Sequence, residues 1–373
     1  MLGREREMVM VAIKQPQRFV SATMVQSTLL LAYFMKRSNI YAVSLLFAST
    51  VFAAGSYKLV KTIPLAGDGG WDYLTADSDN RRLYVSHGTE VDVLNLDSEA
   101  MIGKIPNTNG VHGIALANDL GRGFISDGRD NQVTIFDLKT LAIISTVKAG
   151  TNPDGILYDP FSKRVFAFNG RSKDMTAIDA ATGRDAGTMQ LGGKPEFPAT
   201  DGNGNVFVNI EDKSELVRFD PKTLEVKNRW TLGPQCDSPS GLAIDTSNRR
   251  LFPVCDNKVM AIVDADSGKV ITTIPTGAGT DAAAFDPGTK LVFASNGQDA
   301  TLTVIQEDSP DRYRVVQNAK TQRGARTMAL DLRTHKVYLS TADFGPAPAP
   351  TADNPRPRPK ILPGTFRLLV MSQ

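Results

Sequence analysis

The sequence predicts an all-β protein, a seven-bladed β-propeller with four antiparallel strands in each blade. One unit recurs along the chain with a period of 40 to 45 residues, and a unit of that length made of four strands is typical of a propeller blade. Within each unit, short alternating or β-branched runs are separated by Gly, Asp, Asn and Pro turns, which indicates strands rather than helices. A segment near the start of the chain supplies the one strand that the last unit lacks.

The repeat is clearest in the third unit, where residues 154–160, 164–170 and 177–179 form successive strand phrases. The middle phrase carries an aromatic residue that recurs in every unit. These aromatic positions are Tyr84, Phe124, Phe166, Phe207, Phe252, Phe293 and Tyr338. Seven such positions predict seven blades.

The last unit is incomplete when it is read forwards along the chain. Residues 327–331 and 336–341 provide two strands, and residues 366–372 provide a third. The fourth is predicted at 57–63, which has the pattern of the outermost strand of other units. Pairing the two ends of the chain in one blade closes the ring and removes its open edges.

The start of the chain has the pattern of a secretory signal. The basic segment 35–37 precedes an apolar run at 40–52 and the small pair Ala53-Ala54, which together give the three parts of a signal peptide. We expect cleavage after Ala53, a single propeller domain at 54–373 and a periplasmic or secreted protein. The apolar run is too short for a confident membrane span. Residues 1–34 are then either an extension of the gene model or an unusually long leader.

The charge of the chain excludes one class of partner. With 42 Lys and Arg against 40 Asp and Glu, the formal net charge is +2. Loss of residues 1–53 leaves 36 basic and 38 acidic side chains, a net charge of −2. Such a balance gives no basis for a surface that neutralises nucleic-acid phosphates. We expect a monomer with no membrane span once the signal is removed.

Two cysteines, Cys236 and Cys255, are predicted to form a disulfide. Export places them in an oxidising compartment, where a disulfide is favoured over free thiols. Cys236 precedes the innermost strand of blade five and Cys255 ends its second strand, so both are expected at the same end of neighbouring strands.

The strand phrases resemble those of a known family. The runs Tyr84-Val85-Ser86-His87, Phe293-Ala294-Ser295-Asn296 and Tyr338-Leu339-Ser340-Thr341 resemble the Tyr-Val-Thr-Asn strand of the YVTN β-propeller repeats. With the Asp-Gly and Ile-Asp-Ala-Ala-Thr-Gly phrases around them, residues 56–373 resemble the YncE-like group of exported bacterial propellers. The resemblance implies a secreted seven-bladed ring and no particular reaction, because a fold does not specify a function.

One repeat position concentrates polar chemistry. Antiparallel alternation places the loops that join blades and the loops between second and third strands at the same end of the ring. Alignment on the position before the innermost strand gives Asp72, His112, Asp154, Glu196, Ser240, Asp281 and Arg326. We expect these side chains to circle one mouth of the central channel. They suit a hard cation, an ionisable ligand or acid/base chemistry, or they only cap turns in a water-filled channel.

A second, outer ring is expected where the second strands end. Its members are His87, Asp127, Asn169, Ile210, Cys255, Asn296 and Thr341. The polar members of the first three blades favour a pocket biased toward that part of the mouth. Trp71 adjoins Asp72 and either stacks on a flat ligand or serves packing alone.

A proline-rich loop at 342–365 is expected on the same face. A loop of that length in a compact domain is usually functional or disordered. Its Arg356, Arg358 and Lys360 would cover the acidic mouth as a lid, or the loop is only a polyproline spacer.

The leading hypothesis is therefore an exported scaffold that binds a small ligand, a cation or an envelope protein partner at the mouth. The alternative is an enzyme at the same mouth, a lactonase-like hydrolase or a quinoprotein-like oxidoreductase, with His112 as general base and the carboxylates holding a metal. The sequence carries no recognised nucleophile or cofactor motif, so it identifies no cofactor. A surface interaction protein is a third hypothesis.

Overall fold

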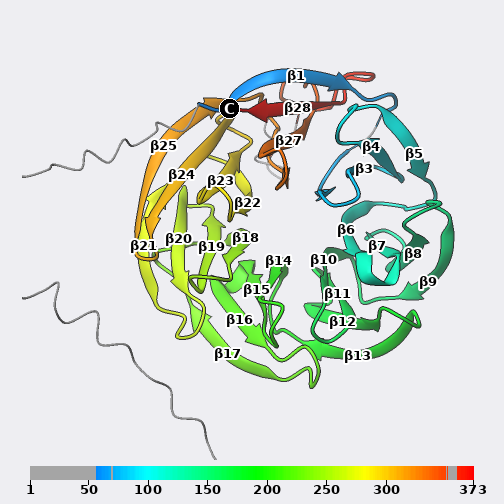
Figure 1. Ribbon diagram of the computed structural model, residues 1–373, viewed down its shortest axis with the longest axis vertical. Coiled ribbons are helices and arrows are strands. Elements are labelled where there is room, and N and C mark those ends of the chain that lie inside the picture. Colours follow the sequence, from blue (N-terminus) through cyan, green and yellow to red (C-terminus); the bar gives the residue numbers. More distant parts are fainter. Residues whose placement is uncertain (1–55, 69, 350, 352–358) are drawn as a thin grey trace, which may run out of the picture. The chain divides into compact units, whose positions relative to one another are not determined.

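The computed structural model describes residues 56–68, 70–349, 351 and 359–373; the expected leader at 1–53 lies outside them. Seven four-stranded antiparallel sheets are arranged in a ring (Figure 1). In most sheets the first strand in the chain lies toward the middle of the ring, and the last lies at the rim. The structure thus confirms the predicted seven-bladed β-propeller. Within the described residues, no helix has the length and hydrophobicity that crossing a bilayer requires.

Blades are numbered in chain order, and their strands are given from the channel outward. Blades 1 to 3 contain β2 (Leu74–Asp77), β3 (Arg82–His87), β4 (Glu90–Asn95) and β5 (Met101–Ile105); β6 (Val111–Ala117), β7 (Arg122–Asp127), β8 (Gln132–Asp137) and β9 (Ile143–Lys148); β10 (Pro153–Asp159), β11 (Arg164–Asn169), β12 (Asp174–Asp179) and β13 (Arg184–Gln190). Blades 4 and 5 contain β14 (Pro195–Thr200), β15 (Val206–Ile210), β16 (Glu215–Phe219) and β17 (Val226–Thr231); β18 (Pro239–Asp245), β19 (Arg250–Cys255), β20 (Val259–Asp264) and β21 (Val270–Pro275). Blades 6 and 7 contain β22 (Thr280–Asp286), β23 (Leu291–Asn296), β24 (Thr301–Ser309) and β25 (Arg312–Lys320); β26 (Met328–Asp331), β27 (Lys336–Thr341), β28 (Arg367–Ser372) and β1 (Lys58–Pro64).

The core lies between the faces of adjacent blades. Middle strands such as β7 and β11 are buried along nearly their whole length, whereas the rim strand β9 is mostly exposed. The seven repeat aromatics are all buried to at least 99%, and one cluster joins Phe124 of blade 2 to Val165 of blade 3. Truncating such a phenylalanine to alanine costs about 3–5 kcal/mol, so packing between blades is the main source of stability.

Both ends of the chain meet in blade 7, as predicted. β1 pairs antiparallel with β28 from Lys58↔Ser372 to Pro64↔Arg367. Tyr57 extends the join, because its N–H donates to Gln317 Oε1 at 2.8 Å and its hydroxyl donates to the His335 carbonyl at 2.8 Å. The N-terminal segment therefore contacts two neighbouring blades.

A buried ion pair connects blade 7, where the two ends of the chain meet, to blade 1. Arg81 of blade 1 donates two hydrogen bonds to Asp331 of blade 7, at 2.8 and 2.9 Å. The Asp331 pKa is held well below its ordinary value, because these bonds outweigh the effect of burial. The two-bond geometry gives this contact directional specificity, which helps to set how blade 1 meets blade 7.

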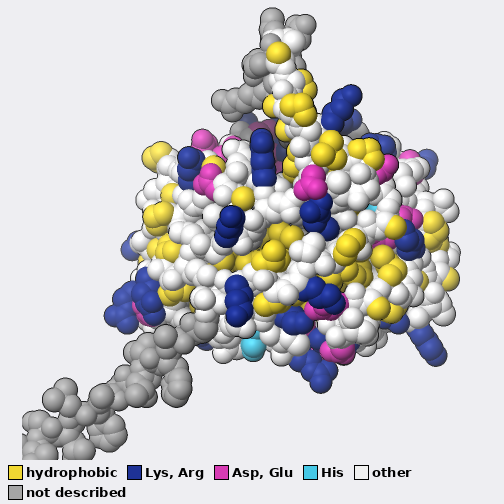
Figure 2. All heavy atoms as spheres, turned by 90° about the horizontal axis from the view of Figure 1, so that it is seen from above, with side chains coloured by type: hydrophobic (Ala, Val, Ile, Leu, Met, Phe, Trp, Pro, Cys, Tyr) yellow, Lys and Arg dark blue, Asp and Glu magenta, His cyan; other side chains and the backbone are white. Residues whose placement is uncertain are grey.

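Charged side chains are dispersed over the surface. On the face that Figure 2 shows, Lys and Arg side chains lie among Asp and Glu side chains, with hydrophobic ones between them. This mixture agrees with the near-zero net charge of the sequence.

The predicted disulfide is confirmed. Cys236 and Cys255 are bonded, with their Cα atoms 5.2 Å apart, and both side chains are fully buried. The bond joins the loop before β18 to the end of β19, at the channel-mouth end of blade 5.

We predict that closure of the ring depends on β1. Deleting residues 54–63 removes most of β1 and leaves the outer edge of β28 unpaired, and exposed edges promote aggregation. We expect aggregation or a large loss of cooperativity in thermal unfolding. Deleting residues 1–53 instead should leave the melting curve unchanged. Equal melting of the two truncations would contradict the role given to β1.

A second prediction concerns the disulfide. Denatured protein that has not been reduced should contain no titratable thiol. Reduction should lower the free energy of unfolding by roughly 3 kcal/mol, because the bond closes a 19-residue interval. Denaturant titrations with and without reductant measure this difference. Two reactive thiols in the unreduced protein would refute the pairing.

Candidate functional site

Each mouth side chain of blades 2 to 6 lies in a β-bulge at the start of an inner strand. In blade 3 the pairing register shifts between Pro153 and Ile156, which encloses Asp154. In blade 2 it shifts between Val111 and Ile114, and blades 4, 5 and 6 repeat the shift. A bulge adds one residue to a strand and changes the direction of its side chains. The repeat thus places a polar residue outside the regular ladder at the same point in each of these blades.

Small residues beside the bulges let the inner strands converge. The mouth residue is followed by Gly113, Gly155 and Gly241 in three blades. A Cβ on Gly155 would lie 2.8 Å from the carbonyl oxygen of Glu196, and one on Gly241 would lie 2.7 Å from that of Asp281. Only glycine therefore allows the backbones of neighbouring blades to approach this closely.

Two blades carry an aromatic residue at this small-residue position. They are blade 1, with Tyr73, and blade 4, with Phe197. Although these blades are three apart in the ring, the two ring centroids lie only 4.3 Å apart. Both residues line the cavity at the mouth, and neither lines the cavity at the opposite end of the ring. We call this aromatic pair, Tyr73 and Phe197, the floor of the mouth cavity.

The mouth is a cavity of about 660 Å³ above this floor. Its lining includes six of the seven predicted inner-ring residues, namely Asp72, Asp154, Glu196, Ser240, Asp281 and Arg326. The seventh, His112, contacts Asp72 and Asp154. Glu211 and Asp256, from loops between second and third strands, line the same cavity. The loops that join blades and the loops between second and third strands therefore lie at the same end of the ring, as the antiparallel alternation of the strands requires.

Most of these carboxylates have a cationic partner. Asp72 accepts a hydrogen bond from His112 Nδ1 at 2.6 Å and lies 3.2 Å from Arg326 Nη2. Arg326 also donates to Asp281. Lys194 lies 2.6 Å from Glu196 and forms a second ion pair with Glu211. The positive groups of blades 2, 4 and 7 thus offset part of the acidic charge.

Of the inner-ring carboxylates, Asp154 is the one least compensated by a cation. Its shortest ion-pair contact in the described part of the chain is His112 Nδ1 at 3.5 Å. Burial raises the pKa of Asp154 to about 6, and the charges of Asp72 and Asp281 add to that effect. Burial raises the pKa of Glu196 to about 8, and the charge of Asp154 adds to that effect while Lys194 opposes it. Burial lowers the pKa of His112, but the hydrogen bond to Asp72 and the nearby carboxylates leave it raised.

Three residues could hold a metal ion at this mouth. One ligand atom from each of Asp72, His112 and Asp154 lies within 4.8 Å of the others. Carboxylate and imidazole groups are ordinary ligands of Zn²⁺ and of other divalent metals. The Arg326 guanidinium that contacts Asp72 would repel such an ion.

A similar cluster, His87, Glu90 and Asp92, already surrounds a cation. The ammonium of Lys104 lies 2.5 Å from Glu90 and 3.1 Å from Asp92. This second cluster is therefore occupied by an internal ion pair.

Side chains of the second strands position the mouth backbone. Ser86 Oγ accepts from the Asp72 N–H at 2.7 Å, and Ser126 Oγ donates to the Asp154 carbonyl at 2.6 Å. Ser295 donates in the same way to the Arg326 carbonyl. These serines were not predicted as site residues, although serine recurs at the third position of the Tyr-Val-Ser-His and Phe-Ala-Ser-Asn phrases.

The structure does not bring the predicted outer ring to the cavity. His87, Asp127 and Asn169 are at most 3% exposed, and none of them lines it. Each bonds to the following strand of its own blade instead. The contacts are His87 Nδ1 to Asp92 at 2.9 Å, Thr134 Oγ1 to Asp127 at 2.5 Å and Asn169 Nδ2 to Asp174 at 2.7 Å. The side chains that end these second strands are therefore buried in the protein and do not face the mouth cavity.

Trp71 and the proline-rich loop form one wall of the cavity. Trp71 stacks on Phe366 with ring centroids 5.4 Å apart, and Phe344 lies 6.1 Å away. Phe344 forms an isolated bridge with Ile361, and both line the cavity. The base of the loop thus contributes to the site. Lys360 is exposed, whereas Arg356 and Arg358 lie outside the described residues.

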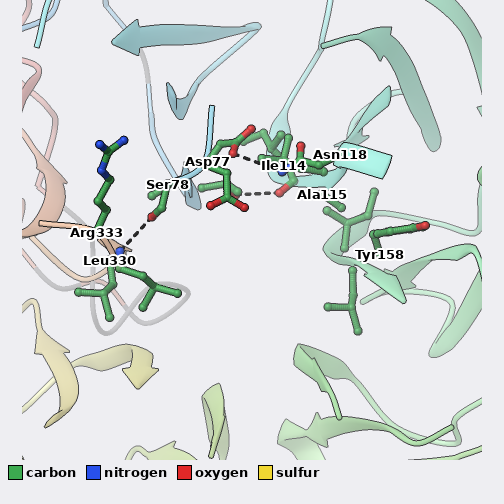
Figure 3. A pocket seen from close by; sticks show the side chains of 15 residues that line it. Asp77, Ser78, Ile114, Ala115, Asn118, Tyr158, Leu330 and Arg333 are labelled. Carbon is green, nitrogen blue, oxygen red and sulfur yellow. Dashed lines mark hydrogen bonds between the residues drawn. The ribbon is translucent and has the colours of Figure 1, made fainter. Parts of the chain in front are cut away.

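A second cavity, of about 600 Å³, lies at the opposite end of the ring (Figure 3). Some of its polar groups have partners, since Asn118 donates to Asp77 at 3.2 Å and Ser78 accepts from the Leu332 N–H at 2.9 Å. The lining also includes apolar residues such as Ile114 and Leu330. Two carboxylates, Asp77 and Asp79, line this cavity, against six at the mouth.

Comparisons with known proteins show the fold alone. No protein-family model matches the chain, and no curated protein sequence matches it. Among solved structures, hydrazine synthase of Kuenenia stuttgartiensis superposes with a TM-score of 0.63 at 15% identity, over 74% of this chain and 94% of that one. U3-55K gives a TM-score of 0.69 at 8% identity, over 84% and 99% of the two chains. The WD40 repeats of RRP9 give 0.69 at 8% identity, over 85% and 100%.

We predict that Glu196→Gln stabilises the protein at high pH. The folded pKa of Glu196, about 8, lies above its ordinary value, so the native state holds the proton more tightly than the unfolded state. Its contribution to stability therefore falls as pH rises from about 4.5 to about 8. The difference in melting temperature, variant minus wild type, should increase by at least about 2 °C between pH 5 and pH 8.5, since 1 kcal/mol shifts the melting point of a large domain by roughly 2–4 °C.

The matched control for this experiment is Glu225→Gln, which changes an exposed glutamate outside the cavity. Its melting difference should stay constant over the same pH interval. A constant difference for Glu196→Gln as well would show that Glu196 ionises as an ordinary surface glutamate.

Proposed function

We propose that this protein is an exported binding protein that holds a small ligand or cation in the cavity at the channel mouth. The observation that carries the proposal is Asp154, a largely buried carboxylate with no closer cationic contact in the described residues than His112 at 3.5 Å. A buried carboxylate without a close partner is costly unless it is neutralised. A positively charged ligand group would supply that neutralisation.

The charge balance of the whole cavity supports a positive ligand. Its acidic lining residues outnumber the basic ones. The acidic residues are Asp72, Asp154, Glu196, Glu211, Asp256 and Asp281, and the basic residues are Lys194, Arg323 and Arg326. With His112 counted beside the basic residues, the acidic residues still outnumber them, six to four. A concave site with charges of one sign raises the local concentration of opposite charges.

The shape of the cavity supports a small molecule. Pockets that bury small ligands usually measure about 300–1,000 Å³, and this one measures about 660 Å³. The floor formed by Tyr73 and Phe197 gives the cavity an aromatic surface against which a ligand would pack.

We propose that the chain is a YncE-like member of the YVTN-repeat propellers, exported and cleaved after Ala53. The repeat phrases support the family assignment. The buried disulfide supports an oxidising compartment such as the periplasm or the cell exterior. Ring rims also serve as protein-binding surfaces, so an envelope partner at the rim is compatible with a ligand at the mouth.

A hydrolase at the same mouth is the second candidate. The observation that favours it is the pair of neighbouring carboxyl groups with raised pKa values, about 6 for Asp154 and about 8 for Glu196. Groups that titrate near neutral pH are suited to general acid and base catalysis. His112 is oriented by Asp72 in the manner expected of a general base. Turnover of a ligand would distinguish an enzyme from a binding protein.

We predict that the native protein retains a bound species at this mouth. Native mass spectrometry of protein isolated from the cells that make it should show an adduct. The triple variant Asp72→Ala, His112→Ala, Asp154→Ala should lose the adduct and still fold, because the core clusters lie between the blades. Asp119→Asn, on the opposite end of the ring, should keep it. Equal retention by the triple variant would show that these side chains only cap turns.

A further inference from the structure

Aromatic side chains make up part of the lining of the mouth cavity. They are Trp71, Tyr73, Phe197 and Phe344. Tyr73 and Phe197 form the floor, and Trp71 and Phe344 lie together on one wall. The faces of such rings attract cations and also pack against hydrocarbon. A metal ion gains little from these walls, since it requires oxygen, nitrogen or sulfur ligands.

Two hydroxyl groups of the lining have no hydrogen-bond partner among the described residues. Thr280 is 5% exposed, and its Oγ1 is buried and unpartnered. Tyr73 Oη is likewise buried and unpartnered. Burial and the charges of Asp154 and Glu196 raise the pKa of Tyr73, so its hydroxyl stays neutral. A neutral hydroxyl accepts hydrogen bonds as well as donating one, and a ligand N–H would satisfy these oxygens.

The existing ion pairs disfavour a divalent metal at Asp72, His112 and Asp154. His112 already donates to Asp72 at 2.6 Å, and Arg326 lies 3.2 Å from the other oxygen of Asp72. A metal ion there would break the first contact and be repelled by the second. A single positive charge beside Asp154 would leave both contacts intact.

We propose that the ligand of the mouth cavity is a protonated organic amine. Its ammonium lies beside Asp154, its N–H groups donate to the unpartnered hydroxyls, and its carbon skeleton packs on the ring faces of the floor and wall. This inference rests on the binding function proposed above and assigns the chemical class of its ligand. The amine is recognised by charge and by apolar shape together, which a metal ion or a neutral molecule cannot match.

Isothermal titration calorimetry of the full-length protein with two amines and their controls tests this assignment. The amines are benzylamine and spermidine, the neutral control is benzyl alcohol, and the metal controls are Ca²⁺, Mn²⁺ and Zn²⁺. We expect measurable binding of at least one amine, and benzyl alcohol and the metals at least about tenfold weaker, since a desolvated cation over aromatic faces gains roughly that factor or more.

Single substitutions locate the amine. Asp154→Asn should weaken amine binding at least about tenfold, and Tyr73→Phe should weaken it severalfold while keeping the ring and therefore the floor. Asp119→Asn is the matched control and should bind the amine as the wild type does. Melting curves of the variants confirm that each is folded.

The outcomes separate this inference from the proposed function. Metal binding that depends on Asp154, without amine binding, would overturn the amine assignment and leave a ligand site at the mouth. Amine binding that is insensitive to both Asp154→Asn and Tyr73→Phe would also overturn the assignment, because the amine would then lie elsewhere. No binding of any probe, together with no retained adduct in native mass spectrometry, would overturn both.

Discussion

The closed ring imposes the constraint on which the rest of the structure depends. Seven inner strands must begin around one narrow axis, and the ring stays closed because β1 from the start of the chain completes the last blade. At the mouth, neighbouring backbones come so close that a Cβ on Gly155 would lie 2.8 Å from Glu196 O. In blades 2 to 6 the mouth residue lies in a bulge, and the mouth residues either line the cavity or, in the case of His112, contact those that do. The geometry of the closed ring, and not any attraction among the side chains themselves, therefore brings these seven polar side chains together.

Collecting carboxylates in a narrow space carries an electrostatic cost, and the protein offsets only part of it. Arg326 and His112 share Asp72, and Lys194 lies between Glu196 and Glu211. Asp154 is left largely uncompensated. Because the fold is stabilised by apolar clusters between the blades, this unfavourable charge is compatible with a stable fold. Polar side chains are thus concentrated at the mouth, whereas the apolar contacts that stabilise the fold lie between the blades.

Residues that depart from the repeat pattern give the mouth cavity its shape. Glycine or another small residue follows the mouth residue in most blades, but Tyr73 and Phe197 replace it in blades 1 and 4 and meet across the axis. The serines of the second strands, such as Ser86 and Ser126, meanwhile keep the common backbone geometry. The repeat thus supplies a scaffold of equivalent positions, and a few exceptions supply the shape and chemistry of the cavity.

The period, the strand alternation and the complementary ends were enough to predict seven blades, their closure and the position of the inner ring at the mouth. These features depend on local patterns repeated in register, which a linear sequence displays directly. The Cys236–Cys255 bond was predicted from the same strand positions together with the expected export to an oxidising compartment. The burial of His87 and Asp127 and the meeting of Tyr73 with Phe197 were decided only in the tertiary structure. The direction of a side chain at a strand end depends on how the next blade packs against it. The distance between two residues on opposite sides of a ring depends on the closure of all seven blades, which no single repeat contains.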